Sequence, residues 1–151
     1  FPMDFLTDWS KAEKEERARY LLDKVNVKDS EDKYPDELSG GMQKRVGIAR
    51  AIALNPTFLF CDEPNSGLDP ETAIVIDHLI SSLTKELGMT TIMNTHDLNS
   101  IMEIGDNIGF LYKGEIIWQG DRHSILSAEC PQLREFLCSN TLARNIIDKS
   151  R

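Results

Sequence analysis

Four short segments contain residues whose types and spacing suit phosphate chemistry. The first is the tripeptide Ser39-Gly40-Gly41, at the start of a predicted helix. The first N–H groups of a helix lack intrahelical partners, glycine leaves them sterically accessible, and the helix dipole adds partial positive charge. The tripeptide could therefore form an anion site that suits phosphate. For the tripeptide alone, an ordinary serine cap on a surface helix is the better interpretation.

Two adjacent acids, Asp62 and Glu63, follow the apolar run Phe58–Cys61. This run predicts a strand that is buried on both faces, and ligands of open α/β sheets bind at the carboxyl ends of strands. Because adjacent strand residues point to opposite faces, one acid can bind Mg²⁺ through water while the other acts as a general base toward a water molecule. The alternative is a strand that simply ends in a polar turn at Pro64.

The other two segments contain Asp69 and His96. Asp69 follows the turn Ser66-Gly67-Leu68 and precedes a proline, so an ordinary turn and helix cap explain it. His96 follows the predicted strand Thr90–Asn94, where a histidine can donate a hydrogen bond to a phosphate oxygen. A surface histidine beside a helix cap is the alternative. Neither segment predicts a function by itself. The order of all four segments along the chain is the more informative feature.

The elements that must position these residues follow from the apolar pattern. It predicts helices over residues 10–25, 39–54, 69–87, 98–104, 122–126 and 132–137, and strands over 58–61, 90–94, 108–112 and 115–118. The apolar residues after Ser139 have roughly helical spacing. Strands that alternate with helices predict an α/β domain with a partly parallel sheet, here preceded by a helical segment.

Composition excludes several classes of protein. The net charge of −8 over 151 residues disfavours a nucleic-acid binder that works through a basic face. No apolar run approaches the roughly 20 residues of a membrane span. The three cysteines, Cys61, Cys130 and Cys138, form no CxxC motif and favour a reducing compartment over a disulfide scaffold.

Together the four segments resemble the motifs of the nucleotide-binding domain of ABC transporters, in the same order. LSGGMQKRVGIARAIALNP resembles the signature motif and its helix, FLFCDEP the Walker B strand, NSGLDP the D-loop and NTHD the switch-histidine loop. The resemblance covers about residues 1–137. It implies an α/β fold of the P-loop NTPase (RecA-like) class, as a partial ABC ATPase core with a helical subdomain.

The resemblance also implies a division of the chain and a dimer. Residues 1–56 would form the helical subdomain with the signature motif, residues 57–120 the Walker B, D-loop and histidine part of the core, and residues 121–151 a C-terminal helical segment. Ser39 and Gly41 would contact the γ-phosphate of ATP held by the opposite subunit of a head-to-tail homodimer, and Gly40 would belong to the same ATP-binding turn. Asp69 would cross the dimer interface toward the phosphate loop of the partner.

The resemblance implies that the remaining site residues take part in ATP hydrolysis. Asp62 would hold Mg²⁺ through water, Glu63 would activate the attacking water, and His96 would contact the γ-phosphate of ATP. Phosphoryl transfer needs mainly positioning and charge neutralisation, which these groups supply.

Three departures from the family pattern are visible. No G-x-x-x-x-G-K-[ST] motif occurs, so the chain is expected to be the C-terminal part of an ABC ATPase and to be inactive alone. Met42 replaces the glutamine that is often fifth in the signature, and Asn65 stands where threonine is usual.

The implied function is that of an ATP-binding subunit that couples ATP hydrolysis to transport. Its partners would be transmembrane permease subunits and its location the inner face of the plasma (inner) membrane. The segments FPMDFL, QKRVGIARAIA and PQLREFL resemble ATPases of Mla-type or Mce-type lipid transporters, which favours a phospholipid cargo. The alternatives are an ABC-type ATPase without a permease and a non-catalytic interaction module.

Overall fold

A computed structural model of the chain describes residues 1–139. The chain forms two compact units, one over Phe1–Thr95 and the other from His96 onward. The signature, Walker B and D-loop segments belong to the first unit, whereas His96 begins the second. The expected helical spacing after Ser139 lies outside the described residues.

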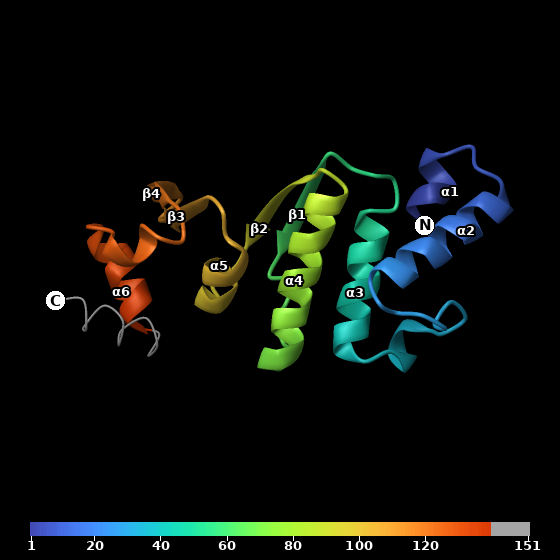
Figure 1. Cartoon of the computed structure of the whole chain (residues 1–151), viewed down its shortest axis with the longest axis horizontal. Helices are drawn as coiled ribbons and strands as arrows, with labels where there is room; N and C mark the ends of the chain where they lie inside the picture. The colour runs from blue at the N-terminus through green and yellow to red at the C-terminus, as the bar shows by residue number, and fades with distance from the viewer. Residues whose placement is uncertain (140–151) are drawn as a thin grey trace. The chain divides into compact units, whose positions relative to one another are not determined.

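The first unit consists of helices followed by a strand–helix–strand motif (Figure 1). Its elements are α1 (Pro2–Leu6), α2 (Lys11–Lys24), the 3₁₀ turn η1 (Pro35–Glu37), α3 (Gly40–Ala51), β1 (Phe58–Asp62), α4 (Pro70–Glu86) and β2 (Thr90–Asn94). The two strands pair in parallel, with Phe58 opposite Thr90 and Asp62 opposite Asn94. Their carboxyl ends therefore meet at one edge, as the α/β prediction requires.

The core of the first unit lies between α2, α3, α4 and one face of the two strands. Its fully buried members include Val25 of the α2 cap, Ile52 of the α3 cap, and Ile76 and Ile80 of α4. Leu59 contributes the inward side chain of β1. Helices α2, α3 and α4 all contribute to this single core, which packs α3 against α4.

The other face of β1 and β2 differs from the prediction. Phe58, Phe60 and Ile92 are 57%, 71% and 54% exposed, whereas Leu59 is buried. The prediction that β1 is buried on both faces is therefore wrong for the described residues. The physical reason is that α4 packs on one face of the strands, whereas no other element of the first unit buries Phe58, Phe60 and Ile92 on the opposite face.

The second unit packs helices against a β-hairpin. It contains α5 (Leu98–Ile104), β3 (Ile108–Tyr112), β4 (Glu115–Gly120), the 3₁₀ turn η2 (Ile125–Ser127) and α6 (Pro131–Ser139). β3 and β4 pair antiparallel across a two-residue turn in which Lys113 and Gly114 have φ of 49° and 86°. Two positive φ angles indicate a type I′ turn, which matches the twist of the strands.

Two elements of the second unit depart from the predicted ones. The strand predicted over residues 115–118 continues to Gly120. The helix predicted around residues 122–126 is replaced by a turn that leads into η2. The carboxylate of Asp121 accepts hydrogen bonds from the N–H groups of His123 (3.0 Å) and Ser124 (2.8 Å), so this side chain stabilises a local turn in place of a helix.

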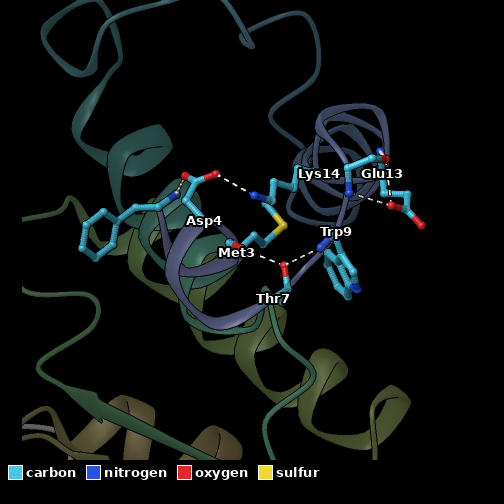
Figure 2. A network of polar contacts seen from close by, with 8 residues as sticks. Met3, Asp4, Thr7, Trp9, Glu13 and Lys14 are labelled. Atoms are coloured by element: carbon cyan, nitrogen blue, oxygen red, sulfur yellow. Dashed lines mark hydrogen bonds and ion pairs between the residues drawn. The ribbon is translucent and has the colours of Figure 1, made fainter.

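A network of polar contacts joins α1 to α2 (Figure 2). The Thr7 hydroxyl donates to the carbonyl oxygen of Met3 at 2.7 Å, and Lys14 forms an ion pair with Asp4 at 3.3 Å. α2 begins with the predicted capping box: the N–H of Glu13 donates to Ser10 Oγ, and the Glu13 carboxylate accepts from the N–H of Ser10. These contacts fix the direction in which α2 leaves α1.

Replacing Ser10 by alanine is expected to lower the free energy of unfolding by about 1 kcal/mol, the usual contribution of a helix cap. The Ser10 hydroxyl and N–H lower the pKa of Glu13 below its ordinary value. The stabilisation is therefore present above the pKa of the unfolded chain and is lost as pH falls through the folded pKa. Urea unfolding of parent and variant at pH 7 and pH 3 measures both effects. Asp8→Ala, on the exposed residue two positions earlier, is the control. A difference that is equal at both pH values would contradict the role of Glu13.

Within residues 1–139, no helix combines the length and apolar character that crossing a membrane requires. Cys61, Cys130 and Cys138 are free cysteines.

Candidate functional site

Ser39 and two glycines form the N-terminal turn of α3. The hydroxyl oxygen of Ser39 accepts a hydrogen bond from the N–H of Met42 at 3.3 Å, which makes Ser39 the N-cap. Gly40 and Gly41 are the first two residues of the helix. The helix is 12 residues long, so its aligned peptide dipoles place partial positive charge at this end. The sequence-based prediction of a capped, glycine-rich helix start is confirmed.

This turn lines a pocket together with the segment that leads into α4. The pocket has a volume of about 380 Å³, and its lining residues come from two stretches of the chain: Ser39, Gly40, Gly41, Met42 and Arg45 on α3, and Gly67, Leu68, Asp69 and Thr72 before and within α4. The structure thus brings together four of the predicted site residues, Ser39, Gly40, Gly41 and Asp69. Donor groups at a helix start beside a pocket can hold a phosphate oxygen.

Glycine is required at position 41 by the close approach of α4. A Cβ atom added to Gly41 would lie 2.7 Å from Cγ2 of Thr72, whereas one added to Gly47, on the same helix, would meet nothing within 4 Å. The side chain of Thr72 has little freedom to move, because its hydroxyl donates to Asp69 Oδ2 at 2.6 Å.

Gly41→Ala is therefore expected to lower the thermal midpoint of the chain, because the new methyl group must displace Thr72 from Asp69. Gly47→Ala is the matched control, and it is expected to stabilise the chain by about 0.5–1 kcal/mol through helix propensity alone. Thermal unfolding followed by circular dichroism measures both variants. If both raise the midpoint equally, the packing of α3 on α4 does not constrain position 41.

Asp69 is the N-cap of α4. Its Oδ1 accepts from the N–H of Thr72 at 3.0 Å, and its Oδ2 accepts from the hydroxyl of the same residue. These hydrogen bonds from Thr72 lower the pKa of Asp69, so its carboxylate is ionised at neutral pH. Gly67, with φ of 77°, allows the turn that brings Asp69 to the pocket, since other residues rarely adopt this conformation.

The two acids lie at the carboxyl edge of β1. Asp62 is exposed, and its Oδ1 accepts from Asn94 Nδ2 of β2 at 2.9 Å. The half-buried Glu63 donates its N–H to the carbonyl oxygen of Asn94 at 2.9 Å. Glu63 has φ of 46°, a left-handed conformation that a residue other than glycine adopts only when its surroundings hold it. The edge prediction is thus confirmed for the positions of both acids.

The donor set at this edge fits a metal ion that is held mainly by a nucleotide. No group of three or more His, Cys, Asp or Glu side chains in residues 1–139 could hold a metal ion by itself. Proteins typically bind Mg²⁺ through one or two carboxylates plus water and substrate phosphates. The exposed carboxylate of Asp62 meets that requirement.

His96 is an exposed residue at the start of the second unit. The next residue, Asp97, caps α5, since its Oδ1 accepts from the N–H of Asn99 at 2.9 Å. His96 therefore lies between a strand end and a helix start, as the sequence predicts.

Comparison with known proteins decides the family. Residues 3–66 match the family model described as "ABC transporter". The solved structure of the ADP conformation of MJ1267, an ATP-binding cassette of an ABC transporter, superposes with a TM-score of 0.76 at 28% identity, over 90% of this chain and 55% of that one. The chain is part of an ABC transporter ATP-binding domain. Its fold is that of the ABC ATPase cassette, a P-loop NTPase fold, as predicted.

Other relatives carry the same ATP-binding designation. The methionine import ATP-binding protein MetN 1 of Shouchella clausii is 44% identical over 81% of this chain and 35% of its own length. The probable ribonucleotide transport ATP-binding protein mkl of Mycobacterium leprae is 35% identical over 91% of this chain and 40% of its own length. The ATP-binding cassette MJ0796, solved as a dimer in a post-hydrolysis state with ADP and Pi, is 34% identical over 81% of this chain and 53% of that one, with a TM-score of 0.69. This part of an ABC ATP-binding domain thus spans well under half of the two curated relatives.

The contacts of two residues around the ABC motifs, Lys44 and Asn94, were not predicted from the sequence. Lys44 Nζ lies 3.4 Å from both the carbonyl oxygen of Glu63 and the hydroxyl of Ser66. Asn94 is the partner of both acids. The position of Asn94 at the end of the next predicted strand could have indicated this contact, since parallel strands bring their carboxyl ends together. No sequence feature indicates the contact of Lys44, because a lysine on a helix is typical of a solvent-exposed face.

Proposed function

We propose that this chain is part of the ATP-binding subunit of an ABC transporter, in which ATP hydrolysis drives transport. The observation that carries the proposal is the pocket in which the signature turn of α3 meets Asp69. In the chain, the segment with Asp69 follows directly after β1 and the two acids at its carboxyl end. The phosphate loop that this chain lacks would come from the rest of the subunit. Residues 1–56, 57–120 and 121–151 are proposed as helical subdomain, half of the catalytic core and C-terminal segment.

The proposed roles follow from the chemistry of each group. The N–H groups of Ser39, Gly40 and Gly41 donate to the γ-phosphate of ATP bound to a second copy of the subunit. Asp69 extends across the same interface. MJ0796, a relative solved as a dimer with ADP and Pi, supports such a pairing.

Hydrolysis is assigned to the acids and the histidine. Bound Mg²⁺ supplies charge neutralisation of the phosphates, and Asp62 would hold it through water. Glu63 accepts the proton of the attacking water, and its left-handed backbone directs the chain out of the sheet at that point. His96 donates to the γ-phosphate.

Turnover of Mg-ATP by the complete subunit, with and without its permease, tests the activity. Sedimentation with and without ATP tests the nucleotide-dependent dimer. A complete subunit that neither binds nor hydrolyses ATP would contradict the proposal and favour the non-catalytic interaction module.

The proposed partners are transmembrane permease subunits, with the ATPase peripheral on the inner face of the plasma membrane. Two cargo classes have support. Phospholipid is favoured by the segments FPMDFL, QKRVGIARAIA and PQLREFL, and methionine by the 44% identity to a methionine import protein. ATP-dependent movement of labelled phospholipid or of labelled methionine by the reconstituted transporter separates the two cargo classes. Activity without any permease would instead favour an ABC-type ATPase that is not tied to transport.

A further inference from the structure

A buried polar pair connects the D-loop to α4. The Asn65 side chain donates from Nδ2 to both carboxylate oxygens of Asp77, at 3.2 Å to Oδ1 and 3.3 Å to Oδ2. Asn65 is 6% exposed and Asp77 is 3% exposed. Asp77 lies among the apolar residues of α4 that build the core, with Ile76 before it and Ile80 one turn after it.

A carboxylate in such a place is costly unless its surroundings compensate for the loss of water. Shape alone would be satisfied by an apolar side chain at position 77, at no desolvation cost. The side chain of Asn65 is the buried polar group of the D-loop, and it faces this carboxylate. The pair is a directional contact between the D-loop and the interior of α4.

Two backbone hydrogen bonds within the D-loop are long, so a side-chain contact outside the loop adds to its order. Within the segment from Glu63 to Asp69, the Ser66 N–H donates to Glu63 O at 3.2 Å and the Leu68 N–H donates to Asn65 O at 3.4 Å. The segment begins with the left-handed Glu63 and ends with the Asp69 cap. Residue 65 lies between these two ends, two residues from Glu63 and four from Asp69.

We propose that Asn65 and Asp77 are positioning residues: their hydrogen-bonded pair holds the D-loop so that the Glu63 carboxylate and Asp69 take their working positions. The sequence shows asparagine at position 65 where the resembled motif usually has threonine. The longer amide side chain can reach the buried carboxylate of α4 and donate to both of its oxygens. The role of the pair rests on the proposed function of Glu63.

The pair can be disturbed and restored with little change in volume. Asn65→Asp places two carboxylates against each other, whereas the double variant Asn65→Asp/Asp77→Asn exchanges the two groups and restores one donor facing one carboxylate. Glu71→Gln is the matched control, since it removes a charge from an exposed position of the same helix.

Hydrogen exchange of the chain, measured by mass spectrometry, gives the first readout. Asn65→Asp is expected to speed exchange in a peptide over residues 63–69 by about tenfold, the factor that corresponds to one lost buried hydrogen bond. A peptide over residues 21–27, at the end of α2, should keep its rate, as should both peptides in Glu71→Gln. The exchanged double variant should return to the rate of the parent. Unchanged exchange in Asn65→Asp, or an equal rise in both peptides, would overturn the proposal.

ATP turnover of the complete subunit gives the second readout, with kcat expressed per ATP-binding site so that unfolded protein is not counted. Asn65→Asp should lower kcat by about tenfold at unchanged KM for ATP, and the exchanged double variant should restore it. If Glu63→Gln abolishes turnover while Asn65→Asp leaves kcat unchanged, the positioning role is wrong and the proposed function stands. If Glu63→Gln itself is fully active, the proposed function fails, and the exchange data still decide whether the pair anchors the loop.

Discussion

Replacing Glu63 by glutamine is expected to lower ATP turnover of the complete subunit by roughly 10²–10⁴-fold, the usual contribution of a general base. Glutamine keeps the size and the hydrogen-bonding oxygen of glutamate but cannot accept a proton from water. The N–H of Glu63 that donates to Asn94 O belongs to the backbone and is retained. Binding of Mg-ATP should therefore persist, and the ATP-bound dimer should accumulate because the nucleotide is no longer consumed.

Steady-state hydrolysis, nucleotide binding by calorimetry and sedimentation with ATP measure the three consequences. Glu31→Gln is the matched control, because it makes the same chemical change at an exposed position of the same unit. Turnover in Glu63→Gln at the rate of the parent would exclude Glu63 as the base. Loss of ATP binding would instead assign the residue to binding.

Element boundaries were predictable from the sequence where a side chain marks them. α4 and α5 begin directly after their predicted caps, Asp69 and Asp97, and both side chains accept a backbone N–H within the first turn. β2 matches its predicted range, Thr90–Asn94: β-branched residues begin the strand, and the polar Asn94 ends it. The predicted helix around residues 122–126 failed for the same kind of reason: Asp121 forms a turn with the following N–H groups, and the apolar pattern alone does not reveal that competition.

The separate segments of the candidate site were predictable from the sequence, but the pocket that they form together was not. The glycines of α3 and Asp69 were each identified from local chemistry, whereas their meeting at one pocket depends on α3 packing against α4. Asp77 shows the limit most clearly. In the sequence Asp77 is a charged residue between apolar ones, which is typical of a solvent-facing helix position. Only the fold shows that it faces Asn65 in the interior.

The exposed face of β1 and β2 leads to the last prediction, which concerns this chain by itself. Phe58, Phe60 and Ile92 lie on that face with half or more of each side chain exposed, and in residues 1–139 the two strands pair only with each other. Full burial of such a side chain is worth about 1.5–3 kcal/mol. Roughly half of that burial is still to be gained, so six side chains from two copies supply about 5–9 kcal/mol of gross favourable free energy. Backbone pairing of the strand edges adds to this value, and the loss of translational and rotational freedom on association subtracts from it.

The 151-residue chain is therefore expected to self-associate at micromolar concentration, through this face and the unpaired strand edges. Replacing Phe58, Phe60 and Ile92 together by threonine keeps the preference for a strand but removes the apolar area, and should shift the chain toward monomer. Tyr34→Thr, at an exposed position outside the sheet, should leave association unchanged. Light scattering and sedimentation velocity measure the mass. A parent chain that is a monodisperse monomer with cooperative thermal unfolding would show that α4 and the inner face of the strands suffice to stabilise this part of the ABC fold. The exposed aromatic residues would then contribute nothing to association.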